Sequence, residues 1–270
     1  MKLLSKTLAL LLPMLVFGGL FSMTFCPVTG VADFFEVIVS FLNAPAKNGY
    51  WYLMTLTMCY LSMQVFRLNR RGSAILDIIL AAATWAVFLA GWKFTAQSID
   101  PLCLLNCANF YPFFILGAFT TKYGLLQKLE ERNWLLTLGM AGFVCLFMYA
   151  APIHALQSVI KHILLPLCAL LAVVYLFLRR KGETSRVERQ LEHIGRNTLD
   201  IYVLHYFLVA NINLQSAGRW MGDSGNAFLA ALTAAALALA VTYLCIAAGR
   251  MLHASDAVNR FVYGRNIFGK

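Results

Sequence analysis

The segment Arg196-Asn-Thr-Leu-Asp-Ile-Tyr-Val-Leu-His205-Tyr-Phe-Leu-Val-Ala210 is the part of the chain on which the expected architecture depends. It begins at the edge of a basic loop and continues into an apolar stretch that carries one histidine, His205. An ionisable side chain inside an apolar span is energetically costly, so such a residue indicates a functional site. We therefore expect the rest of the chain to form a membrane scaffold that holds this segment as a helix.

The composition is that of a polytopic membrane protein with an all-α fold. The chain has 270 residues, of which 60% are hydrophobic and 13% are charged, whereas soluble domains are about half apolar and a quarter charged. A net charge of +10 is compatible with nucleic-acid binding. The basic residues lie in alternate loops, however, which is the pattern of membrane topology. We expect membrane lipids around the protein and no nucleic-acid partner.

Eight apolar segments are candidates for membrane-spanning helices, which need about 20 residues. Segment 108–122 is short, and Pro112 and Gly117 within it indicate a bent or buried helix. An amphipathic stretch at 32–42 is expected to lie along the membrane interface. The eight segments are 7–26, 50–66, 74–92, 108–122, 134–150, 158–178, 197–214 and 226–251.

The distribution of lysine and arginine supports this count and orients the bundle. With eight spans, 18 of the 22 basic residues lie on one side, and the other side holds Lys47, Lys93, Lys161 and Arg219. Since basic loops stay in the cytoplasm, both termini are predicted to be cytoplasmic. We expect a single domain over residues 1–270, with 179–196 as a basic cytoplasmic loop.

The seven cysteines lie mostly in apolar segments, where they behave as small buried hydrophobic residues. Cys103 and Cys107 share one predicted loop, so a disulfide between them is conceivable, although a helical loop would make its geometry awkward. No group of metal-binding residues is evident, so no metal site is expected.

Segment 197–214 carries polar side chains on one side of the predicted helix. At 100° per residue, Thr198, Tyr202, His205 and Asn213 fall within about 80° of one another, and Asp200 begins a second polar edge. A helix of this kind is expected to face a cavity or the bundle interior. His205 can then act as a proton acceptor near a substrate. Alternatively, it forms a hydrogen bond across helices and only fixes their packing.

Three other residues have two interpretations each. Arg196 can bind phosphate through its planar guanidinium, or it is one more basic residue on the cytoplasmic side. Tyr50 and Trp51 can stack on a sugar ring at the outer surface, or they form an interfacial aromatic belt. Asn197 or Thr198 is expected to cap the start of the helix.

The residues around His205 resemble the acyltransferase-3 family of membrane O-acyltransferases. Two further stretches, 48–56 and 110–117, are similar to the family's Trp-Phe-Leu helix start and to its aromatic-rich helix that ends at a glycine. The resemblance covers most of the chain and is greatest to the fucose 4-O-acetylase-like branch. The family's late helix has a Gly, a Ser or Thr followed by Leu, a Tyr and a His, and the matching residues are Gly195, Thr198, Leu199, Tyr202 and His205.

The resemblance implies transfer of an acyl group, usually acetyl, from acyl-CoA to a hydroxyl of a cell-surface or exported glycan or lipid-linked sugar. Acyl-CoA is then the donor substrate, and no bound cofactor is expected. The location implied is the inner membrane of a bacterium. His205 would have a supporting catalytic role with Tyr202. The substrates would contact Tyr50, Trp51 and Asn213, with Arg196 at the CoA phosphates.

The chain departs from the family pattern at its N-terminal end. The family has its main catalytic pair, an Arg and a His, on its first helix, and no Arg or His precedes Arg67 here. Residues 2–13 resemble the family's third helix instead. We therefore expect the first two helices to be absent, so that the chain is inactive or a partner chain supplies them. The alternative is a non-enzymatic membrane protein, such as a polysaccharide or lipid exporter or an assembly subunit.

Overall fold

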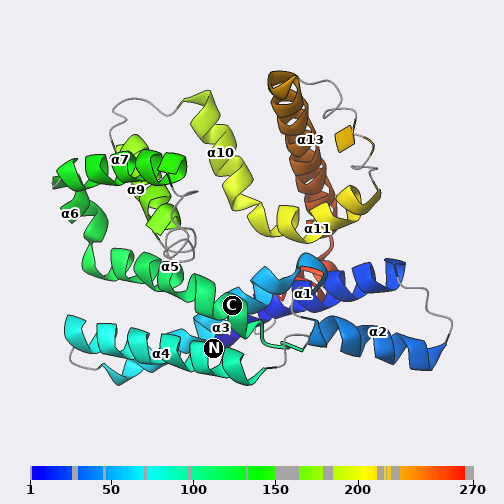
Figure 1. Cartoon of the computed structure of the whole chain (residues 1–270). Helices are drawn as coiled ribbons and strands as arrows, with labels where there is room; N and C mark the ends of the chain where they lie inside the picture. Colours follow the sequence, from blue (N-terminus) through cyan, green and yellow to red (C-terminus); the bar gives the residue numbers. More distant parts are fainter. Residues whose placement is uncertain are drawn as a thin grey trace. The chain divides into compact units, whose positions relative to one another are not determined.

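The protein is all-helical wherever the computed structural model describes it, with no strand in those residues (Figure 1). The described residues are 2–25, 30–44, 47–69, 72–95, 99–131, 133–149, 164–178, 185–211, 216, 218–219 and 226–264. The elements are α1 (Lys2–Phe25), α2 (Val31–Asn43), η1 (Lys47–Gly49), α3 (Trp51–Ser62), η2 (Met63–Leu68), α4 (Ala74–Phe94), α5 (Leu104–Tyr123), α6 (Leu125–Glu131), α7 (Asn133–Tyr149), α9 (Leu165–Leu178), α10 (Arg186–Arg196), α11 (Thr198–Asn211), α13 (Ala227–His253) and α14 (Asp256–Phe261). The all-α prediction is confirmed.

Among the described residues, three helices are long and apolar enough to cross a membrane, namely Ser5–Phe25, Ala74–Phe94 and Phe228–His253. Each has at least 21 residues, and a helix of about 20 residues spans the 30 Å hydrocarbon layer. These helices indicate that the protein is an integral membrane protein. The count of eight spans, the cytoplasmic placement of both termini and the single domain over 1–270 stay predictions.

Side-chain caps define where several helices begin. Ser185 and Glu188 form a reciprocal capping box at α10, with the Ser185 N–H donating to the Glu188 carboxylate at 2.8 Å and the Glu188 N–H donating to the Ser185 hydroxyl at 3.2 Å. Asn226 caps α13, where its side-chain oxygen accepts the N–H groups of Phe228 and Leu229 at 3.1 Å. Such caps satisfy backbone donors that have no partner inside the helix.

Helix α5 begins before the predicted segment 108–122. The Asp100 carboxylate accepts the backbone N–H groups of Leu104 at 2.8 Å and Leu105 at 3.2 Å. This cap lets the helix start at Leu104, so part of the predicted loop is helical. Pro112 lies inside α5.

The chain forms two compact units, Met1–Cys107 with Ser185–Lys270, and Ala108–Thr184. In the first unit, α11 packs against α1 and α13. Its core holds Phe17 of α1, Leu53 of α3 and Val203 of α11, together with Tyr263 just after α14. The ring of Phe17 contacts the ring of Tyr263 edge-on at 5.9 Å. This apolar packing places α11 beside the start of α3.

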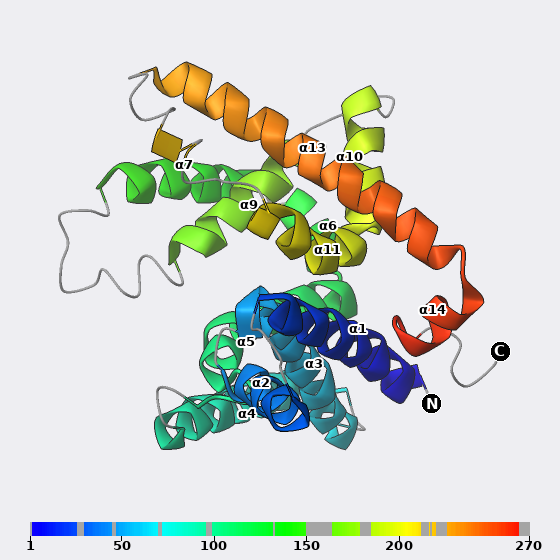
Figure 2. The same cartoon turned by 90° about the vertical axis from the view of Figure 1, so that its right-hand side faces the viewer.

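In the second unit, α7 and α9 lie side by side in both views (Figures 1 and 2). Glycines on α7 make this approach close. A Cβ atom on Gly139 would lie 2.5 Å from the Cβ atom of Leu171, and one on Gly142 would lie 3.2 Å from Sγ of Cys168. Small residues at helix contacts are typical of membrane helix pairs.

Candidate functional site

Helix α11 and the turn before α3 are joined by hydrogen bonds that run in both directions. The Gly49 carbonyl accepts the hydroxyl of Tyr202, and it also accepts the hydroxyl of Tyr206 at 3.1 Å. In return, the Tyr50 hydroxyl donates to the Val203 carbonyl at 2.8 Å. These contacts hold the middle of α11 against residues 49–50, although the two segments are far apart in sequence.

Gly49 is the centre of this contact because only glycine fits there. Its φ is +94°, in the region that side-chain-bearing residues rarely adopt. A Cβ atom at this position would lie 2.0 Å from Cζ of Tyr206. The Tyr206 ring therefore lies directly over the glycine.

Four tyrosines, which we call the tyrosine cluster, surround this point: Tyr50, Tyr52, Tyr202 and Tyr206. Tyr50 is fully buried, and its ring centroid lies 6.3 Å from that of Tyr202 and 5.1 Å from that of Tyr206. The Tyr202 hydroxyl also accepts the backbone N–H of Tyr52 at 3.3 Å. Edge-on and tilted aromatic contacts of this kind add to the stabilisation from burial.

We expect Tyr50→Phe to lower the free energy of unfolding by about 1 kcal/mol, because the buried bond to the Val203 carbonyl is lost while the ring stays. Thermal unfolding of the detergent-solubilised protein measures this change. Tyr52→Phe is the matched control, since the Tyr52 side chain is 42% exposed. Equal melting temperatures for wild type and Tyr50→Phe would show that the bond contributes nothing to stability.

His205 lies one turn after Tyr202, with its ring 3.9 Å from the ring of Tyr206 between centroids. Its Nδ1 atom is 2.8 Å from the Tyr202 carbonyl and 3.0 Å from the Ile201 carbonyl. Carbonyl oxygens only accept, so Nδ1 carries the proton and donates. In the neutral ring, Nε2 then has a lone pair, and no described residue forms a hydrogen bond to it. This is the form of histidine that can accept a proton.

The same geometry bears on the alternative role for His205. The hydrogen bonds that its ring forms with described residues stay within α11. They do not join α11 to another helix. The side-chain hydrogen bonds that join α11 to residues 49–50 come from Tyr50, Tyr202 and Tyr206 instead.

The other predicted site residues lie at different places. Trp51 is partly buried at the start of α3, and its ring contacts the ring of Tyr52 at 6.0 Å. Arg196 ends α10, where its exposed guanidinium forms an ion pair with Glu192 at 2.5 Å. Asn213 lies outside the described residues. The structure thus brings Tyr50, Tyr202 and His205 together.

The expected cap of α11 is wrong in its direction. The Asn197 side chain donates to the His193 carbonyl at 2.7 Å, and the Thr198 hydroxyl donates to the Gly195 carbonyl at 2.7 Å. Both acceptors belong to the end of α10. Because only Asn197 separates the end of α10 from the start of α11, the free carbonyls of α10 compete for the same side chains.

The candidate site lies within a match to a known protein family. The acyltransferase-3 family model, described as an acyltransferase domain, matches residues 1–248. The chain belongs to the acyltransferase-3 family. No curated protein and no solved structure matches it. The matched range contains both His205 and the tyrosine cluster, so this acyltransferase-3 protein carries its candidate site inside the family domain.

Sequence reasoning missed a second polar cluster in this acyltransferase-3 protein. Asp200 of α11 is only 4% exposed, and its carboxylate contacts the ring of His253 at the end of α13. The sequence feature that pointed to this cluster was Asp200 itself, an acidic residue inside an apolar segment. Its partner lies 53 residues away, at a distance that no spacing rule predicts.

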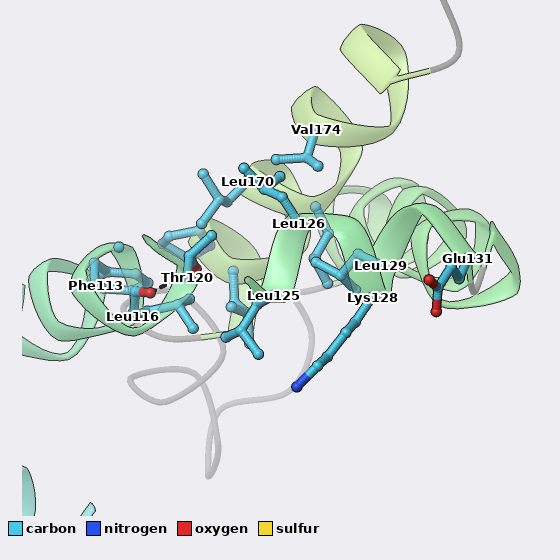
Figure 3. A pocket seen from close by; sticks show the side chains of 14 residues that line it. Phe113, Leu116, Thr120, Leu125, Leu126, Lys128, Leu129, Glu131, Leu170 and Val174 are labelled. Atoms are coloured by element: carbon cyan, nitrogen blue, oxygen red, sulfur yellow. Dashed lines mark hydrogen bonds between the residues drawn. The ribbon is translucent and has the colours of Figure 1, made fainter. Parts of the chain in front are cut away.

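The second unit contains an apolar cavity of about 980 Å³ between α5, α6 and α9. Figure 3 shows Lys128 extending away from Leu126 and Leu170, which line the hollow. The Thr120 hydroxyl in its wall donates to the Leu116 carbonyl at 2.7 Å. The lining is suited to an apolar chain, and the described residues in it include no histidine to activate a hydroxyl.

Lys47, Asp100 and Cys103 form a buried group before α5. The Lys47 ammonium donates to the Leu42 carbonyl and, at 3.4 Å, to the Ala44 carbonyl. Burial lowers the pKa of Lys47. Burial also raises the pKa of the Cys103 thiol to about 11, although the nearby Lys47 charge opposes this shift. Such a thiol is protonated at neutral pH and is a poor nucleophile.

Cys103 and Cys107 are thiols in the structure, not a disulfide. The Cys107 N–H donates to the Cys103 carbonyl at 2.9 Å, so the two residues lie one helical turn apart. The residues that the structure describes contain no group of three His, Cys, Asp or Glu side chains that could hold a metal ion.

Proposed function

We propose that this protein is a membrane-bound O-acyltransferase that transfers an acyl group, usually acetyl, from acyl-CoA to a hydroxyl of a cell-surface or exported glycan. The observation that carries the proposal is the acyltransferase-3 match over residues 1–248. The geometry of His205 supports it, because Nδ1 is held by backbone carbonyls and Nε2 is left to accept a proton. The location that fits this activity is the inner membrane of a bacterium.

In the proposed reaction, His205 Nε2 accepts the proton of the sugar hydroxyl as that oxygen attacks the carbonyl carbon of the thioester. The carbon–sulfur bond breaks, and CoA leaves as a thiolate. The thiolate then takes the proton from the His205 imidazolium, so the products are the sugar ester and CoA. General-base catalysis by a placed side chain contributes about 10²- to 10⁴-fold to a rate.

Other side chains have supporting roles in the proposal. The Tyr202 hydroxyl holds α11 to Gly49 and so sets the position of His205 on the next turn. Trp51 and Asn213 would contact the acceptor sugar. Arg196 is exposed and would exchange its partner Glu192 for a CoA phosphate, to which a guanidinium offers two parallel donors.

Labelled acetyl transfer in membranes tests the proposal. Membranes from cells that express the full chain are incubated with radiolabelled acetyl-CoA and a fucose-containing glycan, and membranes from cells with the empty vector are the control. We expect label in the glycan that depends on the chain and that mild alkali releases, because the product is an ester. Chain-dependent label that resists alkali would exclude O-acylation. Absence of transfer would mean that the chain needs the family's first helices from a partner chain, or that it is a non-enzymatic membrane protein.

A further inference from the structure

Three helices of the first unit meet at one partly buried histidine, His253. His253 Nε2 lies 3.0 and 3.1 Å from the two carboxylate oxygens of Asp200, on α11. Its Nδ1 lies 2.5 Å from the side-chain oxygen of Asn259, on α14. Figure 2 shows α13 turning at its end into the short α14, the helix that contains Asn259.

The hydrogen bonds determine which atoms of this group carry protons. The Asn259 amide nitrogen donates to the His253 carbonyl at 2.8 Å, so its oxygen is the atom that faces Nδ1. Since that oxygen only accepts, Nδ1 must donate. Nε2 faces an acidic carboxylate and donates as well. With Asp200 ionised, both ring nitrogens are protonated, and the ring forms an ion pair that has no lone pair left for base catalysis.

The Asp200 end of the ion pair is enclosed by close packing, and the His253 side chain is 19% exposed. A Cβ atom on Gly249 would lie 2.8 Å from Cβ and 2.9 Å from Cγ of Asp200. Cys245 and Gly249 precede His253 by eight and four residues, so the three lie on one face of α13. Cys245 is fully buried, and the Tyr263 ring covers His253 at 4.3 Å between centroids. Charges in such a place are stable only as a pair.

The position of the pair on α11 connects it to the candidate site. Asp200 precedes His205 by five residues, about 7.5 Å along the helix axis. The tyrosine cluster attaches the middle of α11 to Gly49, and the ion pair attaches its first turn to α13. Attachments at two points fix both the position of α11 along its axis and its rotation about that axis. A single attachment would let α11 rotate about its axis.

We propose that Asp200 and His253 are positioning residues for acyl transfer, which hold α11 so that His205 Nε2 points to the reacting hydroxyl. This inference rests on the proposed function. Neither residue contacts the substrate, and each acts through His205. A displacement of a catalytic group by about 1 Å can lower a rate by about 10²-fold.

Two variants disturb the pair in different ways. Asp200→Asn removes the negative charge, and Gly249→Ala keeps the carboxylate but pushes it aside. We expect each to lower kcat for labelled acetyl transfer by about 10- to 100-fold, with less than a twofold change in KM for acetyl-CoA. Ala247→Val, at an exposed position on the same helix, is the matched control. In a His205→Ala background, the same variants should lower the rate by less than twofold. A full additional loss there would overturn the positioning role.

A second measurement is independent of activity. The full chain in detergent is treated with N-ethylmaleimide, and the labelled cysteines are identified by peptide mass spectrometry. We expect Cys245 to be protected in wild type and to react at least tenfold faster in Asp200→Asn and Gly249→Ala, with exposed Cys145 as the reference and buried Cys59 still protected. An unchanged Cys245 rate would overturn the inference.

The two measurements separate the possible failures. A wild-type chain without transferase activity counts against the proposed function of this chain on its own, and the labelling of Cys245 still decides whether the ion pair holds α11 to α13. If Cys59 also becomes reactive in Asp200→Asn, the variant has unfolded. Asn259→Ala then decides, because it keeps the Asp200 carboxylate and removes both Asn259 contacts to His253, which orient the His253 ring toward Asp200. Faster Cys245 labelling in Asn259→Ala, with Cys59 protected, would support the inference, and an unchanged rate would overturn it.

Discussion

Gly49→Ala is expected to unfold the first unit or to lower its free energy of unfolding by about 3 kcal/mol or more. A side-chain-bearing residue in the left-handed region is less stable by about 1–2 kcal/mol, and φ is +94° here. The new Cβ atom would also lie 2.0 Å from Cζ and 2.2 Å from the hydroxyl oxygen of Tyr206. Displacing that ring disturbs both tyrosine hydrogen bonds to the Gly49 carbonyl, each contributing about 1 kcal/mol. Folded domains are stable by only about 5–15 kcal/mol.

Thermal unfolding in detergent, together with the yield of monodisperse protein, measures the effect. Gly30→Ala is the matched control, because Gly30 has φ −153° and a Cβ atom added there would meet nothing within 4 Å. That variant should stay within about 0.5 kcal/mol of wild type. A Gly49→Ala protein that melts with wild type would show that α11 is not held by residues 49–50.

The positions of the helices could largely be predicted from the sequence. Apolar stretches of about 20 residues indicate spans, and α1, α4 and α13 lie where these stretches are. Local signals also identify ends, such as the Ser185 and Glu188 pair at α10. The sequence did not predict that α5 starts at Leu104. That start depends on the Asp100 carboxylate, which accepts the N–H groups of Leu104 and Leu105, and this contact is seen only in the structure.

The candidate site could be predicted only in part. His205 is recognisable because an imidazole in an apolar segment is costly. The state of its ring is not, since it depends on the carbonyls of Ile201 and Tyr202. The partners of Tyr202 and Asp200 lie 153 and 53 residues away, and helix periodicity carries no information about contacts at such separations.

His205→Ala is expected to lower kcat for labelled acetyl transfer by about 10²- to 10⁴-fold, because it removes the imidazole Nε2 that accepts the proton in the proposed reaction. KM for acetyl-CoA should change little, since Nε2 acts on the hydroxyl of the acceptor and not on the donor. His205→Gln should lose as much activity as His205→Ala. Glutamine can donate a hydrogen bond to the helix carbonyls, but its amide is not a base.

The matched control for His205 is Asn211→Ala, on the same helix. Asn211 is exposed, and its side chain donates to the Phe207 carbonyl of α11 at 2.7 Å. Its loss should leave kcat within about twofold of wild type, because a single exposed hydrogen bond contributes little to helix position. Cys245 should remain protected from N-ethylmaleimide in His205→Ala, which would show that α11 has not moved. Transfer that is unaffected by His205→Ala would remove this residue from the mechanism and leave the acyltransferase-3 assignment in place, because that assignment rests on residues 1–248 as a whole.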